Sequence, residues 1–146
     1  AVAAGDNGAV WEDACVEFFS IPAGDGIYYN VECNCAGILL IGAGAGRENR
    51  EHAPQEVMDK VQRWSSLGRQ SFEERVGECN WELALVIPYS AFFKHQITSL
   101  DGKTVRANFY KCGDKLQTPH FLSWNPIALE KPNFHCPEFF GTLNFE

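Results

Sequence analysis

The sequence lacks the excess of positive charge that binding to nucleic acid requires. It has 12 Lys and Arg residues against 19 Asp and Glu residues, so its formal net charge is −7. Affinity for nucleic acid comes largely from Lys and Arg side chains that displace counterions from phosphates. We therefore expect no nucleic-acid partner.

The sequence also lacks a long apolar run. Its longest one, residues 36–45, is rich in glycine and far shorter than the ~20 residues that a membrane-spanning helix needs. No basic and then apolar leader opens the chain, so any export signal has been removed or was never there. We expect a soluble protein without a membrane partner.

Two kinds of cofactor site lack their sequence signature. The glycine run at residues 42–46 follows an apolar stretch, as a dinucleotide-binding turn does, but Arg47 stands where the third glycine of that motif belongs. The six cysteines form no paired CxxC units, and five of them stand in apolar or strand-like surroundings. This pattern favours buried thiols, and an even number leaves one or two disulfides open for an exported protein. A zinc site is a weaker alternative, with Cys33, Cys35, His120, His135 and Cys136 as its candidate ligands.

What the sequence does contain is a series of short alternating segments separated by turn residues. With 146 residues the chain fits one domain. Many short strands and few helices predict an all-β, antiparallel sandwich of the jelly-roll type, with one or two short helices in loops. We expect strands at residues 10–20, 27–34, 37–42, 82–87, 105–112, 121–124 and 139–145.

Helical and turn signals fall between these strands. Pro54 opens a plausible helix in which Val57, Val61 and Trp64 recur at helical spacing. Residues 89–94 suit a single helical turn, and residues 101–102, Asp-Gly, predict a hairpin turn that leads into the strand at 105–112.

Aromatic and acidic residues share one face of the first expected strand. A pyranose ring stacks its C–H face on an aromatic side chain, while its hydroxyls bond to carboxylate, amide and Arg groups. Trp11 next to Glu12, Asp13 and Glu17 supplies such a set. This set suits a sugar-binding surface, but an aromatic residue in a strand more often belongs to the core, so the composition of the strand leaves both interpretations of Trp11 open.

Two acids on neighbouring expected strands leave an enzymatic alternative open. Glycoside hydrolysis needs two carboxyl groups a set distance apart across a cleft, and Glu17 and Glu32 are candidates. Carboxylates on a sugar-binding surface also accept hydrogen bonds from hydroxyls without any acid–base role. We favour that interpretation, because a lone sandwich of this length has little room for a deep cleft.

Residues 10–19 resemble the Trp-x-x-x-x-Val-Glu-x-Phe strand of family 9 carbohydrate-binding modules, and the bacterial family 9-like domains are more similar still. Residues 28–34 are similar to the strand that follows in those proteins. Residues 122–125 fit as well, and residues 133–143 resemble their C-terminal signature. The likeness runs from Val10 to the end of the chain.

This resemblance implies a β-sandwich that binds carbohydrate without changing it. The ligand would be a small sugar or the end of a glucan or xylan chain, held between two aromatic rings. By motif position, Trp11 is the first ring and Phe134 the second, and Glu17 and Asn133 bond to sugar hydroxyls. A structural calcium ion occurs in the family, but no spacing in this sequence marks its ligands, so we assign no cofactor. An extracellular, periplasmic or cell-surface location is expected.

The sequence also departs from the family pattern. Glu32 falls near the sugar-binding arginine of the family, which replaces a donor with an acceptor, and Phe134 is smaller than the usual tryptophan. Sugar specificity therefore does not transfer, and a scaffold domain that has lost sugar binding stays an alternative. The tryptophan motif begins at residue 11, whereas family members carry several strands before it. We therefore expect residues 1–146 to form one carbohydrate-binding sandwich domain that lacks N-terminal strands, with its oligomeric state open.

Overall fold

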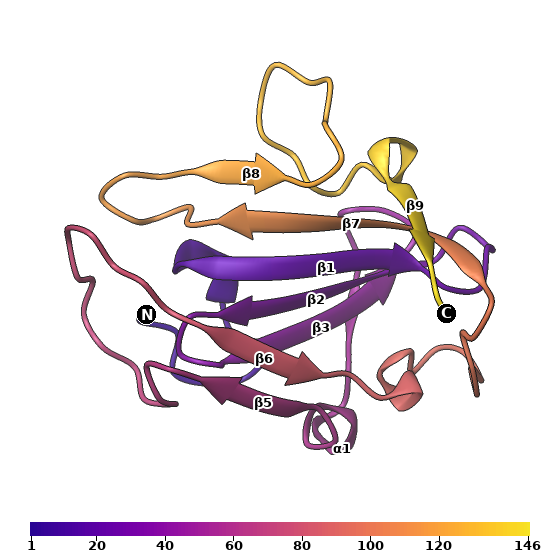
Figure 1. The fold of residues 1–146 in the computed structure, drawn as a ribbon, viewed down its shortest axis with the longest axis horizontal. Helices are drawn as coiled ribbons and strands as arrows, with labels where there is room; N and C mark the ends of the chain where they lie inside the picture. The colour runs from indigo at the N-terminus through magenta and orange to yellow at the C-terminus, as the bar shows by residue number, and fades with distance from the viewer.

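The computed structural model describes residues 1–146, which form a seven-stranded sheet and a smaller two-stranded sheet (Figure 1). The strand order in the large sheet is β4-β3-β2-β1-β7-β8, and β9 pairs with β7 as well. All pairings are antiparallel. The predicted all-β, antiparallel, sandwich-like fold is confirmed. No helix has the length and apolar character needed to cross a membrane.

The elements are short, as the frequent turn residues predict. The strands are β1 (Cys15–Ile21), β2 (Tyr28–Asn34), β3 (Leu39–Gly44), β4 (Glu51–His52), β5 (Gln62–Ser65), β6 (Leu83–Val86), β7 (Thr104–Cys112), β8 (Phe121–Ser123) and β9 (Gly141–Asn144). The helical elements are the 3-10 turns η1 (Val10–Glu12), η2 (Tyr89–Ala91) and η3 (Pro137–Phe139), and the α-helix α1 (Gln55–Met58).

Three local predictions were wrong. The first strand begins at Cys15, since the carbonyl of Trp11 accepts a hydrogen bond from the N–H of Asp114 at 3.0 Å rather than joining the sheet. The helix ends at Met58, and Trp64 lies on β5, where its backbone pairs with β6. The turn at residues 101–102 leads into β7 but closes no hairpin, because the partners of β7 are β1, β8 and β9.

The two faces of the large sheet differ in chemistry. Along β1, Glu17 and Phe19 are buried on one face, whereas Phe18 lies on the other. We call these the Glu17 face and the Phe18 face. The Phe18 face packs against α1, β6 and η2, and the Glu17 face packs against η1 and the segment that ends in Phe140.

Polar residues on the Glu17 face are fixed by a buried network. The guanidinium of Arg50 donates to Asn30 Oδ1 at 2.8 and 3.0 Å and to the carbonyl of Tyr28 at 2.8 Å. It also stacks on the Tyr28 ring at 4.0 Å. The side chain of Asn30 leaves no room for a side chain at residue 42 on β3, since a Cβ on Gly42 would lie 2.6 Å from Asn30 Oδ1. The first glycine of the run at residues 42–46 therefore serves close packing between β2 and β3.

Candidate functional site

A hollow of about 90 Å³ opens on the Glu17 face. Four segments that are distant in sequence meet there: η1 with β1, the loop after β3, the β7–β8 connection and residues 132–135. Four of the five predicted binding residues line the hollow, namely Trp11, Glu17, Asn133 and Phe134. The fifth, Glu32, does not line it. The other lining residues are Arg47, Asp114, Phe121, Pro132 and His135.

Trp11 lines the hollow and is 38% exposed. Its backbone is held by the β7–β8 connection, because its carbonyl accepts the N–H of Asp114. The next residue adds a second tie, since the carbonyl of Glu12 accepts the N–H of Lys115 at 3.1 Å and the two side chains form an ion pair at 2.6 Å. The backbone that carries the ring is therefore held in place, while Trp11 stays partly exposed to a ligand.

Phe134 supplies the second ring and rests on an aromatic support. Its ring stacks on Tyr110 with centroids 4.1 Å apart and planes within 5°, and the edge of Phe121 meets it at 6.2 Å. The Tyr110 hydroxyl also donates to the Phe134 carbonyl at 3.2 Å. The tyrosine covers one side of Phe134, so the orientation of this wall of the hollow is set by β7.

Glu17 is the buried acidic residue at the hollow, and Glu32 lies directly opposite it on β2. Glu17 accepts a hydrogen bond from the Cys112 thiol at 3.0 Å. Glu32 is 4% exposed; its Oε1 accepts from Asn30 at 2.8 Å, and its Oε2 is buried without a partner. Burial raises the pKa of Glu32 to about 7. Burial and the charge of Glu32 raise the pKa of Glu17 as well.

Three charged or titratable groups at the hollow were not among the predicted sugar-binding residues. Arg47 is exposed and offers guanidinium donors, and Asp114 offers a carboxylate. His135 Nδ1 bonds to the Tyr28 hydroxyl at 2.8 Å, and burial together with the charges of Arg50 and Arg47 lowers the pKa of His135 to about 4. His135 is therefore neutral at pH 7. It lies within the stretch 133–143 that the motif had marked, whereas Arg47 follows the glycine run and Asp114 lies in the β7–β8 connection, where no motif indicated a sugar contact.

The geometry gives little support to the hydrolase alternative. A pair of catalytic carboxyl groups must both reach a substrate across a cleft. Only Glu17 of the candidate pair lines the hollow, and Glu32 is enclosed behind it. The hollow thus presents no Glu17–Glu32 pair to a glycosidic bond.

The proposed zinc ligands are not brought together. His120 Nε2 contacts the Lys111 ammonium at 2.6 Å, His135 contacts Tyr28, and Cys33 is in the core of the Phe18 face. All six cysteines are free thiols, five of them buried, which confirms the prediction of mostly buried thiols. The ligand-type side chains that do cluster are Cys15, Glu17 and Cys112, and a thiol–carboxylate hydrogen bond joins the last two.

The model of the family described as carbohydrate-binding family 9 matches residues 1–145 of the chain. The chain belongs to carbohydrate-binding family 9. A crystal structure of a Bacteroides uniformis protein named for carbohydrate binding is similar to it, with 70% sequence identity and a TM-score of 0.97. The match covers 100% of this chain and 67% of that one. No functionally curated protein matches the sequence.

Membership in carbohydrate-binding family 9 confirms the resemblance inferred from residues 10–19 and 133–143. Modules of this family bind carbohydrate and are not catalysts. The hollow has the chemistry that such a module needs, because flat apolar rings stand next to carboxylate, amide and guanidinium groups.

Proposed function

We propose that the hollow binds a small sugar or the end of a glucan or xylan chain between Trp11 and Phe134, without altering it chemically. The observation that carries this proposal is the meeting of both rings with Glu17 and Asn133 in one hollow. The two rings come from opposite ends of the chain, so their juxtaposition is produced by the fold.

The size of the hollow favours a chain end over an internal segment. Its volume of about 90 Å³ is below the roughly 300–1,000 Å³ of pockets that enclose a drug-sized ligand. One sugar ring would insert in part, with its faces against the aromatic side chains, and the rest of the ligand would extend into solvent. A shallow site of this kind contacts a terminal residue from several sides.

Polar groups around the rings would orient the sugar hydroxyls. Glu17 supplies an acceptor, and Arg47 supplies charged donors. Asn133 uses its Oδ1 to accept the N–H of His135 at 3.1 Å, so its amide nitrogen is left as a donor. Hydrogen bonds to charged groups contribute about 1.5–3 kcal/mol each. Glu32 falls near the position where family members carry a sugar-binding arginine, and it offers no such donors. Arg47 supplies guanidinium donors from another segment.

A pair of tryptophan variants tests the proposal. Glucose, cellobiose and xylo-oligosaccharides would be titrated into the wild-type protein, Trp11→Ala and Trp64→Ala, with isothermal calorimetry as the readout. Trp64 is a matched control because it is 54% exposed but lies on β5, outside the hollow. We expect Trp11→Ala to lower affinity at least tenfold, equivalent to about 1.4 kcal/mol, while Trp64→Ala binds like the wild type.

Two outcomes would contradict the proposal. If no sugar or polysaccharide in a broad glycan panel binds the wild-type protein, the domain is a scaffold that has lost sugar binding. If a sugar binds and Trp11→Ala retains full affinity while folded, the sugar site lies elsewhere. The variant Arg47→Ala measures how much the guanidinium donors contribute to sugar affinity. We expect it to lose affinity at unchanged stability, because Arg47 is exposed.

A further inference from the structure

Two cysteines and a glutamate meet on the Glu17 face of the large sheet. Cys15 and Glu17 are two residues apart on β1, so they share that face, and Cys112 of β7 lies directly opposite Cys15. One ligand-type atom of each residue lies within 4.8 Å of those of the other two, and all three residues are buried. We call this set the thiol–carboxylate cluster.

The cluster has the donor types and the spacing of a site for a thiophilic divalent ion. Zn²⁺ binds thiolate sulfur at about 2.3 Å and carboxylate oxygen at about 2.0–2.2 Å, usually as a tetrahedron. Two sulfur ligands of such a tetrahedron are then about 3.8 Å apart. In the cluster, Cys112 Sγ lies 3.0 Å from Glu17 Oε1, and no pair of ligand atoms exceeds 4.8 Å. Small side-chain rotations therefore suffice to bring all three atoms to one ion.

No cationic side chain pairs with the acidic groups at the cluster. Neither Glu17 nor Glu32 forms a salt bridge with Lys, Arg or His. Glu32, directly opposite Glu17, has a carboxyl oxygen that is buried without a hydrogen-bond partner. Burial raises the pKa of Glu17 and of the Cys15 thiol. Buried charges are normally paired or coordinate a metal, so a divalent cation at this place would stabilise the ionised forms of these groups.

The hollow gives an ion access to the cluster. Glu17 lines the hollow although it is buried, and Asp114, two residues after Cys112, lines it too. The two carboxyl groups would attract a cation from solvent. Three protein ligands leave one position of a tetrahedral ion open, and a water molecule from the hollow can fill it.

We propose that Cys15, Glu17 and Cys112 bind a thiophilic divalent metal ion of the zinc class next to the hollow. Each thiol gives up its proton on binding, and the ion replaces the hydrogen bond between Cys112 and Glu17. None of the zinc ligands that the sequence suggested belongs to this site, because it is the pairing of β1 with β7 that brings the two thiols together. Competition between the ion and a sugar for Glu17 rests on the proposed function, whereas metal binding itself does not.

Titration with Cd²⁺ in the absence of sugar tests the proposal. Cd²⁺ is the probe because its bonds to thiolate give an ultraviolet absorption band, whereas its bonds to histidine or carboxylate do not. The parent protein carries Cys79→Ser, since Cys79 is the exposed thiol, and a phosphine reductant keeps the other thiols reduced. We expect one Cd²⁺ per chain with the thiolate band, and displacement of Cd²⁺ by Zn²⁺. Ca²⁺ in about hundredfold excess should not displace it, because Ca²⁺ prefers oxygen ligands.

Variants of the cluster make the test specific. Cys15→Ala and Glu17→Gln should each weaken Cd²⁺ binding at least tenfold relative to the parent protein. Cys33→Ala is the matched control, because Cys33 is an equally buried thiol in the core of the Phe18 face, and it should bind Cd²⁺ like the parent. Glu17→Gln keeps the shape of the side chain, so it tests the site even if the loss of a buried thiol unfolds the protein. Circular dichroism verifies the fold of each variant.

Three results would overturn the proposal. The folded parent protein binds no Cd²⁺, or it binds Cd²⁺ without the thiolate band, which would assign the binding to surface histidine or carboxylate groups. In the third, folded Cys15→Ala and Glu17→Gln bind Cd²⁺ as tightly as the parent, so the ligands lie elsewhere. No sugar takes part in these measurements, so each of these results leaves the proposed function standing.

Discussion

Replacement of Glu32 by Gln should make the protein more stable at alkaline pH while leaving its stability near pH 5 almost unchanged. Glu32 is buried opposite Glu17, and burial raises its pKa from 4.5 to about 7. The native state therefore holds this proton more tightly than the unfolded state does. The stabilisation that results is complete below about pH 4.5 and is lost as the pH rises through about 7.

The size of the effect follows from the two pKa values. A difference of one pH unit between folded and unfolded pKa corresponds to about 1.4 kcal/mol. Because the pKa of Glu32 rises from 4.5 to about 7, its ionisation costs roughly 3 kcal/mol more in the folded protein than in the unfolded chain. Gln has nearly the same shape, can keep the hydrogen bond from Asn30 and carries no charge to bury. We therefore expect the free energy of unfolding of Glu32→Gln to rise relative to that of the wild type by roughly 3 kcal/mol as the pH goes from 5 to 8.5.

The assay is urea denaturation of both proteins at a series of pH values from 5 to 8.5. The free energy of unfolding of the variant must be compared with that of the wild type at each pH, because the titration of His135 changes stability in the opposite direction. Its native pKa of about 4 is below its ordinary 6.5, so its contribution is present above pH 6.5 and is lost as the pH falls toward 4. That term is common to both proteins and cancels in the comparison. Glu78→Gln is the control, because Glu78 is an exposed carboxyl group in a loop, and its curve should parallel the wild type.

Parallel curves for Glu32→Gln and the wild type would refute this reasoning, as would a variant that is less stable at pH 8.5. Either result would mean that the folded protein accommodates an ionised Glu32 with ease. The unpartnered Oε2 of Glu32 would then have a bonding partner, such as a buried water.

Two further predictions concern the packing behind the hollow. Gly42→Ala should reduce the free energy of unfolding by about 1–3 kcal/mol, because its Cβ would lie 2.6 Å from Asn30 Oδ1. Gly46→Ala, with nothing within 4 Å of its Cβ, should change it little in the same urea titration. Cys112→Ala should cost about 1–3 kcal/mol by removing the donor to the buried Glu17 carboxyl. Cys112→Ser keeps an O–H donor and should lose less, and equal losses in the two variants would show that the thiol acts through its volume alone.

The sequence predicted the large sheet well because its strands have two chemically different faces. Alternation in residues 15–21, 28–34 and 104–112 is visible without any knowledge of the partners. The error at Trp64 has a physical cause. Its helical spacing from Val57 and Val61 is coincidental, and pairing with β6, about twenty residues further along the chain, decides its conformation.

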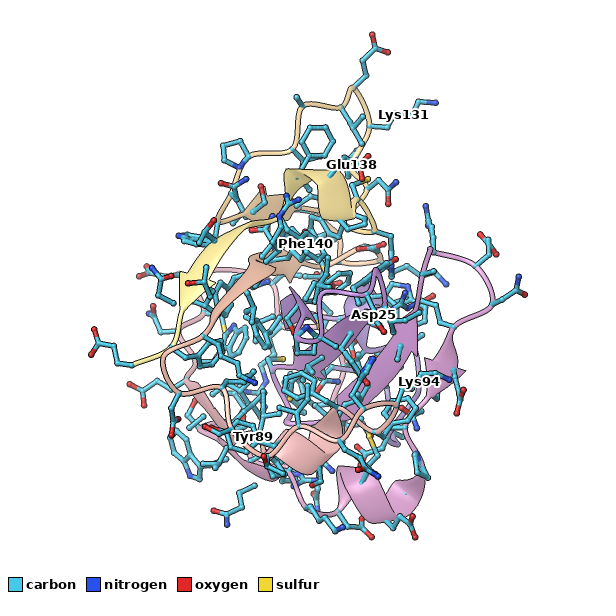
Figure 2. The ribbon with its side chains drawn as sticks, turned by 90° about the vertical axis from the view of Figure 1, so that its right-hand side faces the viewer. Asp25, Tyr89, Lys94, Lys131, Glu138 and Phe140 are labelled. Carbon is cyan, nitrogen blue, oxygen red and sulfur yellow. The ribbon has the colours of Figure 1, made fainter.

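The site was predictable where a motif supplied the residues and unpredictable where loops meet in space. Trp11, Glu17, Asn133 and Phe134 lie in the two stretches that resemble the family, and all four line the hollow. Arg47 reaches it from a glycine-rich loop in which no motif indicated a sugar contact. Figure 2 shows how loops extend beyond the sheet, with Lys131 on the outermost of them and Tyr89 at the η2 turn on the opposite side.

The hollow on the Glu17 face and the apolar surface of the Phe18 face depend on adjacent residues of the same strands. Glu17 of β1 points to the hollow and Phe18 to the apolar surface, and on β7 Tyr110 supports Phe134 while Phe109 lines the apolar surface. Side chains of neighbouring residues in a strand point to opposite faces, so the two faces present different side chains of the same strand. The cysteine variants use this alternation, because one removes a thiol from the Glu17 face and its control removes a thiol from the Phe18 face. Loss of metal binding in both variants would indicate damage to the shared sheet rather than to the metal site.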